Sequence, residues 1–172
     1  MEADSGAPLK KILVGVDGSD KSDEALSVAL DIADRYGAEV TIIHVLEPTP
    51  IPSTKYPVTV SGSVESMANP EWVDIYYTKT TEAAKDLLNK SSEIATKTYP
   101  KLRVREKLAE GKPAEEIIKE ARDGGYDLIV LGSHGLSNFE EFLLGSVSTD
   151  VVNQSKVSVL IVKSSLFTKS QY

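Results

Sequence analysis

Two short stretches near the C-terminus contain the residues of this chain best suited to bind a ligand. Leu131-Gly132-Ser133-His134-Gly135 follows an apolar run, and Gly145-Ser146-Val147-Ser148 comes after nine intervening residues. Glycine lets the backbone approach a ligand and turn sharply, because no Cβ is in the way. A helix is expected to begin at Ser146, and the free N–H groups of a helix N-terminus favour an anion. The pattern indicates a phosphate site, although the spacing fits equally well glycines that only turn a loop.

The composition limits the classes of protein to which the chain can belong. Its 172 residues, of which 41% are hydrophobic and 26% charged, predict a single globular domain. A net charge of −7 argues against nonspecific nucleic-acid binding, which needs a basic surface. There is no cysteine for disulfides, thiol catalysis or cysteine metal sites. No apolar run approaches the ~18 residues of a membrane span, and no signal sequence is evident, so a cytoplasmic protein is expected.

Apolar runs and helical stripes alternate along the chain. Nearly continuous apolar runs predict buried strands, and apolar residues three and four apart predict helices. Strands are expected at 10–17, 40–46, 102–109, 127–131 and 157–162, and helices at 19–36, 70–99, 113–124 and 146–155. The second helix is expected to bury a stripe formed by Trp72, Ile75, Tyr76, Ala83, Leu87, Ile94 and Ala95. The alternation predicts an α/β domain with a single doubly wound, five-stranded parallel sheet and helices on both faces.

Three segments lack such patterning: the two ends of the chain, which limit the domain, and one internal stretch. Residues 1–9 are expected to form a flexible leader, residues 10–163 the domain, and residues 164–172 a tail. Residues 47–69 contain four prolines and many hydroxyl side chains, so they are expected to form a long loop. Loops of this length in compact domains are either functional lids or partly disordered.

A ligand of such a sheet is expected at the carboxyl ends of its strands. The common strand order 2-1-3-4-5, or a variant of it, is expected to bring the ends of the first and fourth strands together. The crevice would then be lined by Val16-Asp17-Gly18-Ser19, by His44-Val45-Leu46 and by the glycine segment. Asp17 is the carboxylate at this edge. It can bond a ribose hydroxyl or hold a cation, or it can simply cap the turn at Gly18-Ser19.

The spacing Gly132-x2-Gly135-x9-Gly145-Ser146, with Ile-Val-Leu-Gly-Ser-His-Gly before it and the opening run 12–19, resembles the ATP-binding branch of the universal stress protein family. The resemblance extends over residues 10–163 and implies a fold like that of adenine nucleotide alpha hydrolases and flavodoxin. It implies phosphates on the glycines, Ser146 and Ser148, Asp17 near the ribose, and Val45 against the base. The predicted nucleotide site comprises Val16, Asp17, Gly18, Ser19, Val45, Leu131, Gly132, Gly135, Gly145, Ser146, Val147 and Ser148.

The resemblance further implies a cytoplasmic stress-response regulator that binds ATP, ADP or AMP, with Mg²⁺ held through the phosphates. It also implies a homodimer paired through Val157 to Val162, an uncharged apolar strand expected at the sheet edge. One departure concerns charge. Family members often carry Arg or Lys after the second glycine and midway to the third, where this chain has Leu136 and Glu140-Glu141. Lys55 in the proline-rich loop is a hypothetical replacement for that charge.

Catalytic interpretations receive little support from the residues. Ser133 and His134 are adjacent, which is unfavourable for a nucleophile and its base, and His44 is expected to be a hydrogen-bonded core residue. P-loop, dinucleotide-binding and nucleophile-elbow motifs are absent from the sequence, so at most slow ATP hydrolysis is expected. Two alternatives remain. One is an ATP pyrophosphatase or adenylating enzyme, distantly suggested by Asp17-Gly18-Ser19-Asp20-Lys21-Ser22, and the other is a dimeric interaction module without nucleotide.

Overall fold

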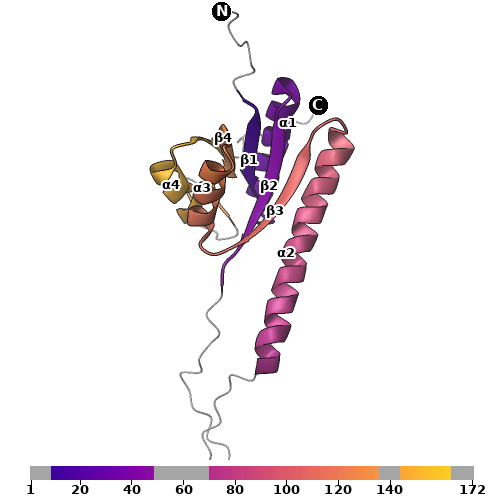
Figure 1. Cartoon of the computed structure of the whole chain (residues 1–172), viewed down its shortest axis with the longest axis vertical. Helices are drawn as coiled ribbons and strands as arrows, with labels where there is room; N and C mark the ends of the chain where they lie inside the picture. The colour runs from indigo at the N-terminus through magenta and orange to yellow at the C-terminus, as the bar shows by residue number, and fades with distance from the viewer. Residues whose placement is uncertain (1–8, 49–69, 136–143, 164–172) are drawn as a thin grey trace, which may run out of the picture.

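The computed structural model describes residues 9–48, 70–135 and 144–163, and Figure 1 shows the arrangement of their helices and strands. Strands and helices alternate along the chain, which confirms the predicted α/β class. The elements are β1 (Lys11–Gly15), α1 (Asp20–Tyr36), β2 (Glu39–Leu46), α2 (Pro70–Thr98), β3 (Val104–Glu110), α3 (Pro113–Asp123), β4 (Leu128–Gly132), α4 (Ser146–Gln154) and β5 (Ser158–Val162).

The five strands form one parallel sheet in the order β3-β2-β1-β4-β5. This order is a variant of the common order 2-1-3-4-5, and the expected adjacency of the first and fourth strands is confirmed. Val14 of β1 lies opposite Ile42 of β2 and Val130 of β4, so these three strands end close together. The point at which the connections reverse direction lies between β1 and β4, which is where a ligand crevice is expected.

Helices cover both faces of the sheet because the side chains of each strand alternate between faces. In β1, Ile12 and Val14 pack with α1 and α2, whereas Leu13 packs with α3 and α4. The first face is closed mainly by small side chains of α1, such as Ala25 and Ala29, which are fully buried. The continuous apolar runs of the sequence thus reflect strands that are buried on both sides.

Helix α2 presents to the sheet a different face from the one predicted. Its buried residues in the described part of the helix are Ala84, Leu88, Ser91 and Ala95. Ile75, Tyr76 and Ile94 are about half exposed and Ala83 is exposed too, so the predicted stripe is wrong at these positions. Figure 1 shows the reason for the first two, because the N-terminal part of α2 extends past the end of the sheet.

Local signals explain where helix α1 begins and ends. The Ser19 hydroxyl accepts a hydrogen bond from the Ser22 N–H, which caps the N-terminus, and Gly37 ends the helix with a φ of 67°. Among the described residues, no helix is both long enough and apolar enough to span a membrane. The predicted leader, proline-rich loop and tail fall wholly or mostly outside the described residues, as do Lys55, Leu136 and Glu140-Glu141.

Candidate nucleotide-binding site

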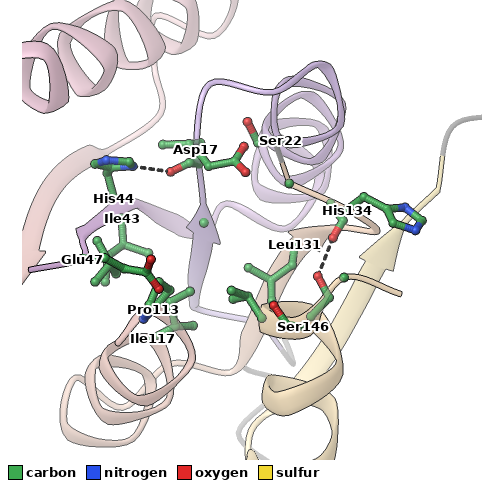
Figure 2. Close-up of a pocket in the computed structure, with 18 of the residues that line it drawn as sticks. Asp17, Ser22, Ile43, His44, Glu47, Pro113, Ile117, Leu131, His134 and Ser146 are labelled. Atoms are coloured by element: carbon green, nitrogen blue, oxygen red, sulfur yellow. Dashed lines mark hydrogen bonds between the residues drawn. The ribbon is translucent and has the colours of Figure 1, made fainter. Parts of the chain in front are cut away.

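A cavity of about 420 Å³ lies at the carboxyl ends of β1, β2 and β4 and at the N-termini of α3 and α4 (Figure 2). Its size falls within the range of small-molecule sites. The residues that line it come from five separate parts of the chain. They are Gly15, Val16, Asp17, Ser22, Ile43, His44, Val45, Leu46, Glu47, Pro113, Ile117, Leu131, Gly132, His134, Gly135, Gly145, Ser146, Val147 and Ser148.

The N-terminus of α4 is fixed against the end of β4 and opens on this cavity. The Gly145 N–H donates to the Ser133 carbonyl at 2.8 Å, and the Ser148 hydroxyl donates to the Gly132 carbonyl at 2.8 Å. Gly145 is the N-cap and makes no side-chain capping bond. The first N–H groups of a helix have no partner within the helix. The Gly145 N–H is occupied, so the backbone donors available at this wall are those of Ser146 and Val147.

The glycines of the motif are required by close contacts within the protein. A Cβ on Gly132 would lie 2.8 Å from the carbonyl group of Lys21, and a Cβ on Gly135 would overlap Asp17 Oδ2. Neither residue, nor Gly145, has a positive φ. The lack of a Cβ at Gly132 and Gly135 instead allows α1 and Asp17 to approach the backbone at the end of β4.

Asp17 caps the turn after β1 and also lines the cavity. Its Oδ1 accepts hydrogen bonds from the Ser19 N–H at 3.0 Å and from the Ser19 hydroxyl at 2.6 Å, so it does cap the turn. Its other oxygen, Oδ2, lies against Gly135 at the cavity wall. One oxygen therefore orders the β1–α1 turn, and the second faces the site.

His44 holds the end of β1 in place. Its Nδ1 lies 2.7 Å from the Val16 carbonyl oxygen (Figure 2), and because a carbonyl only accepts, Nδ1 must carry the proton. The Val16 N–H donates in turn to the Ile43 carbonyl at 2.9 Å. The expected hydrogen bond of His44 is confirmed, but its expected place in the core is wrong, because the side chain is only partly buried and lines the cavity. Its bond fixes the residue that precedes Asp17.

Ser133 and His134 do contact each other, contrary to expectation. His134 Nδ1 lies 3.1 Å from Ser133 Oγ. However, Ser133 is only 3% exposed and is not among the cavity-lining residues, and Figure 2 shows the His134 ring directed away from the cavity. Ser133 is therefore not placed to act as a nucleophile on a molecule bound in the cavity, although His134 contributes to the lining.

Carboxylates dominate the charge around the site. Asp17 and Glu47 line the cavity, and within the described residues no Lys or Arg does. Burial raises the pKa of Asp23 in the first turn of α1, and the negative charges of Asp20 and Asp17 raise it further. Among the described residues there is no group of three or more His, Asp or Glu side chains arranged to hold a metal ion.

Most residues of the predicted nucleotide site line this one cavity, and the exceptions are Gly18 and Ser19. Ser19 is occupied in capping α1, and Gly18 forms the turn before it with a φ of 82°. Sequence reasoning missed Glu47 and the two residues of α3, Pro113 and Ile117. The strand-end rule could have found these two, because α3 begins directly after β3 at the same edge of the sheet.

Comparison with known proteins identifies the class. The model of the universal stress protein family matches residues 8–163, and the chain belongs to this family. It is 34% identical over 154 residues to the universal stress protein YxiE of Bacillus subtilis, covering 89% of this chain and 98% of the relative.

Two solved structures are similar to the chain over nearly its full length. The MJ0577 protein of Methanocaldococcus jannaschii is 34% identical and superimposes with a TM-score of 0.69, covering 91% of this chain and 96% of that one. A universal stress protein solved in complex with cAMP is 27% identical and has a TM-score of 0.62, covering 91% and 98%.

Proposed function

We propose that this protein binds an adenine nucleotide (ATP, ADP or AMP) in the cavity between β1, β2 and β4 and acts as a regulatory module. The observation that carries the proposal is the uncapped N-terminus of α4, which opens on a ligand-sized cavity beside the glycine motif. Such a helix terminus attracts anions. A relative that is 27% identical has been solved with cAMP, which supports the same class of ligand here. A stress-response role and a cytoplasmic location stay predictions.

The proposed arrangement assigns one part of the nucleotide to each wall. The base packs on Val45, the ribose lies near Asp17 Oδ2, and a phosphate accepts hydrogen bonds from the first turn of α4 at Ser146 and Val147. Ser148 contributes mainly by holding the loop, because its hydroxyl already donates to the Gly132 carbonyl. Mg²⁺, when it binds, is proposed to do so through the phosphates.

Calorimetry and thermal denaturation of ligand-stripped protein test the binding proposal. Adenine nucleotides are expected to bind and to raise the melting temperature, because a ligand that binds only the folded state stabilises it. Absence of any shift with ATP, ADP, AMP or cAMP, with and without Mg²⁺, contradicts the proposal. Mass spectrometry of ligand released from freshly purified protein provides an independent check.

We also propose that two copies pair through β5. This strand is at the sheet edge and contains no charged residue from Ser158 to Val162. An uncharged edge exposes backbone groups that can pair with a second chain. Sedimentation equilibrium is expected to report a dimer, and Ile161→Lys is expected to shift it toward monomer while nucleotide binding persists. A native chain that stays monomeric at every concentration contradicts this pairing.

Turnover is proposed to be slow or absent. The Asp17-Gly18-Ser19 turn, which distantly resembles the loop of ATP pyrophosphatases, is occupied by its own hydrogen bonds and by the cap of α1. ATP incubated with the protein should therefore yield little product. Rapid release of pyrophosphate and AMP in the presence of an acceptor would favour the adenylating enzyme instead.

A further inference from the structure

The charge of the cavity wall restricts which nucleotide the site can accept. The charged side chains that line it are two carboxylates, Asp17 and Glu47. Two lysines lie close to lining residues without lining the cavity themselves. Lys21 packs its backbone on Gly132, and Lys112 Nζ, next to Pro113, forms an ion pair with Glu115 at 2.7 Å. In the described part of the chain, no cationic side chain thus lines the cavity to neutralise a polyphosphate.

The Asp17 carboxylate lies where an added negative charge is most unfavourable. Its Oδ2 is in contact with the Gly135 backbone, which is next to Gly145 at the start of α4. A phosphate bound to the α4 N-terminus would therefore have a carboxylate as a near neighbour. The influence of Asp17 is already visible in α1, where its charge helps to raise the pKa of Asp23. Like charges in a partly enclosed site repel strongly, because solvent screens them poorly.

The attractive groups of the site are neutral and few. A helix N-terminus carries the equivalent of roughly half a positive charge. It is supplemented by the Ser146 hydroxyl at the cavity wall, whereas the Ser148 hydroxyl already donates to Gly132. These donors suit one phosphate group. Each further phosphate adds negative charge beside Asp17 and Glu47 without a matching cation.

We infer that the site is selective for adenine nucleotides with a single phosphate group, either a 5′-monophosphate or a cyclic phosphodiester, and binds the triphosphate only when a divalent cation accompanies it. The inference rests on the proposed nucleotide function of the cavity. It assigns the discrimination to the carboxylates of the wall, with Glu47 at its β2 side and Asp17 at its β1 side. The energetic origin is electrostatic, so the discrimination weakens as salt is added.

Isothermal titration of ligand-stripped protein with four probes tests the inference: AMP, cAMP, ATP with EDTA, and ATP with Mg²⁺. AMP or cAMP is expected to bind about tenfold or more tightly than metal-free ATP at low salt, and Mg²⁺ is expected to recover most of the difference. Metal-free ATP that binds as tightly as AMP overturns the inference and leaves the proposed function intact. Failure of all four probes to bind overturns the proposed function itself.

Two variants that each remove one negative charge distinguish an effect of the cavity wall on affinity from an effect of the protein's net charge. Glu47→Gln removes a carboxylate from the lining, and Glu106→Gln removes the same charge from an exposed position of β3 outside the cavity. Glu47→Gln is expected to raise the affinity for metal-free ATP about threefold to tenfold while changing that for AMP much less. Equal effects of the two variants, or no effect of Glu47→Gln on the ratio of ATP to AMP affinity, overturn the assignment.

Discussion

The two ends of the β-sheet treat their polar groups in opposite ways. At the amino end, Asp127 Oδ2 accepts hydrogen bonds from the backbone N–H groups of Lys10 and Lys11, at 2.8 and 2.9 Å. The Lys11 ammonium donates to the Gly124 carbonyl and lies 4.6 Å from the centroid of the Tyr126 ring. The polar groups at this end thus satisfy one another within the protein.

At the carboxyl end, the corresponding groups border an open cavity. Within the described residues, Asp17 and Glu47 form no ion pair, and the N-terminus of α4 has no side-chain cap. Internal hydrogen bonds there serve to shape the wall, as at His44 and Ser148. The comparison shows that polar groups are paired with one another at the amino end of the sheet, whereas at the carboxyl end they border a cavity of the size of a small-molecule site.

The largest expected effect of a single change is on stability and comes from the amino end. In Gly124→Ala the new Cβ would overlap the Tyr126 ring and lie 2.9 Å from the Glu120 carbonyl oxygen. Such overpacking costs about 3 kcal/mol, which corresponds to a fall in melting temperature of roughly 6–12 °C for a domain of this size. Nucleotide affinity measured well below the melting temperature should not change.

Gly37→Ala is the matched control for this variant, because it also ends a helix but has open space where the Cβ would lie. Its cost, from a φ of 67°, is expected to be about 1 kcal/mol. A Gly124→Ala protein that melts normally but binds nucleotide poorly would mean that the two ends of the sheet are not independent.

The next effect concerns the buried hydroxyl of Tyr126. The Tyr126 hydroxyl donates to Thr41 Oγ1 at 2.8 Å, and Thr41 is only 4% exposed. In Tyr126→Phe, the buried Thr41 hydroxyl therefore loses this hydrogen-bond partner. The expected loss is about 2 kcal/mol of unfolding free energy. Thermal denaturation should report it, while Tyr77→Phe, at an exposed tyrosine that bonds Glu110, should leave the melting temperature unchanged.

The same residue predicts a dependence on alkaline pH. Burial raises the pKa of Tyr126 above its ordinary value of 10.0, and the neighbouring Glu120 carboxylate adds to the increase, whereas the bond to Thr41 opposes it. Because the folded-state pKa is the higher one, the contribution of Tyr126 to stability is complete below pH 10.0 and is lost as the pH rises through the folded-state value. Tyr126→Phe should therefore lose less stability above pH 10.0 than the native chain. Equal losses of stability in the variant and the native chain over this alkaline range would contradict the assignment of the pH dependence to Tyr126.

At the carboxyl end, Gly135→Ala is expected to weaken nucleotide binding without unfolding the protein. The new Cβ would overlap Asp17 Oδ2, which is a side-chain atom that can move, so the change displaces the carboxylate rather than the backbone. The expected loss of affinity is about tenfold, or about 1.4 kcal/mol. The double variant with Asp17→Ala is the control, since the overlap is then absent and the second change should cost much less. If the affinity losses of the two single variants simply add in the double variant, the proposed contact between Gly135 and Asp17 is contradicted.

The sequence was sufficient to predict the elements and the position of the site, because periodicity and strand-end rules depend only on local order. It was insufficient for strand order, because the side on which β3 joins β2 depends on how the long α2 crosses the sheet. It also failed at Ile75 and Tyr76, because a helical stripe does not reveal where the sheet beneath it ends. Gly135 lines the cavity, as the predicted site requires, but its contact with Asp17 is visible only in three dimensions.

The smallest expected effect comes from His44, and it tests whether hydrogen bonds at the carboxyl end shape the site or only stabilise it. His44→Leu removes the donor to the Val16 carbonyl, which lies one residue before Asp17, whereas His44→Asn keeps a donor near the position of Nδ1. Nucleotide affinity is expected to fall about threefold in the first variant and to recover in the second. If both variants bind equally well, the bond from the Val16 N–H to the Ile43 carbonyl is sufficient to position Asp17.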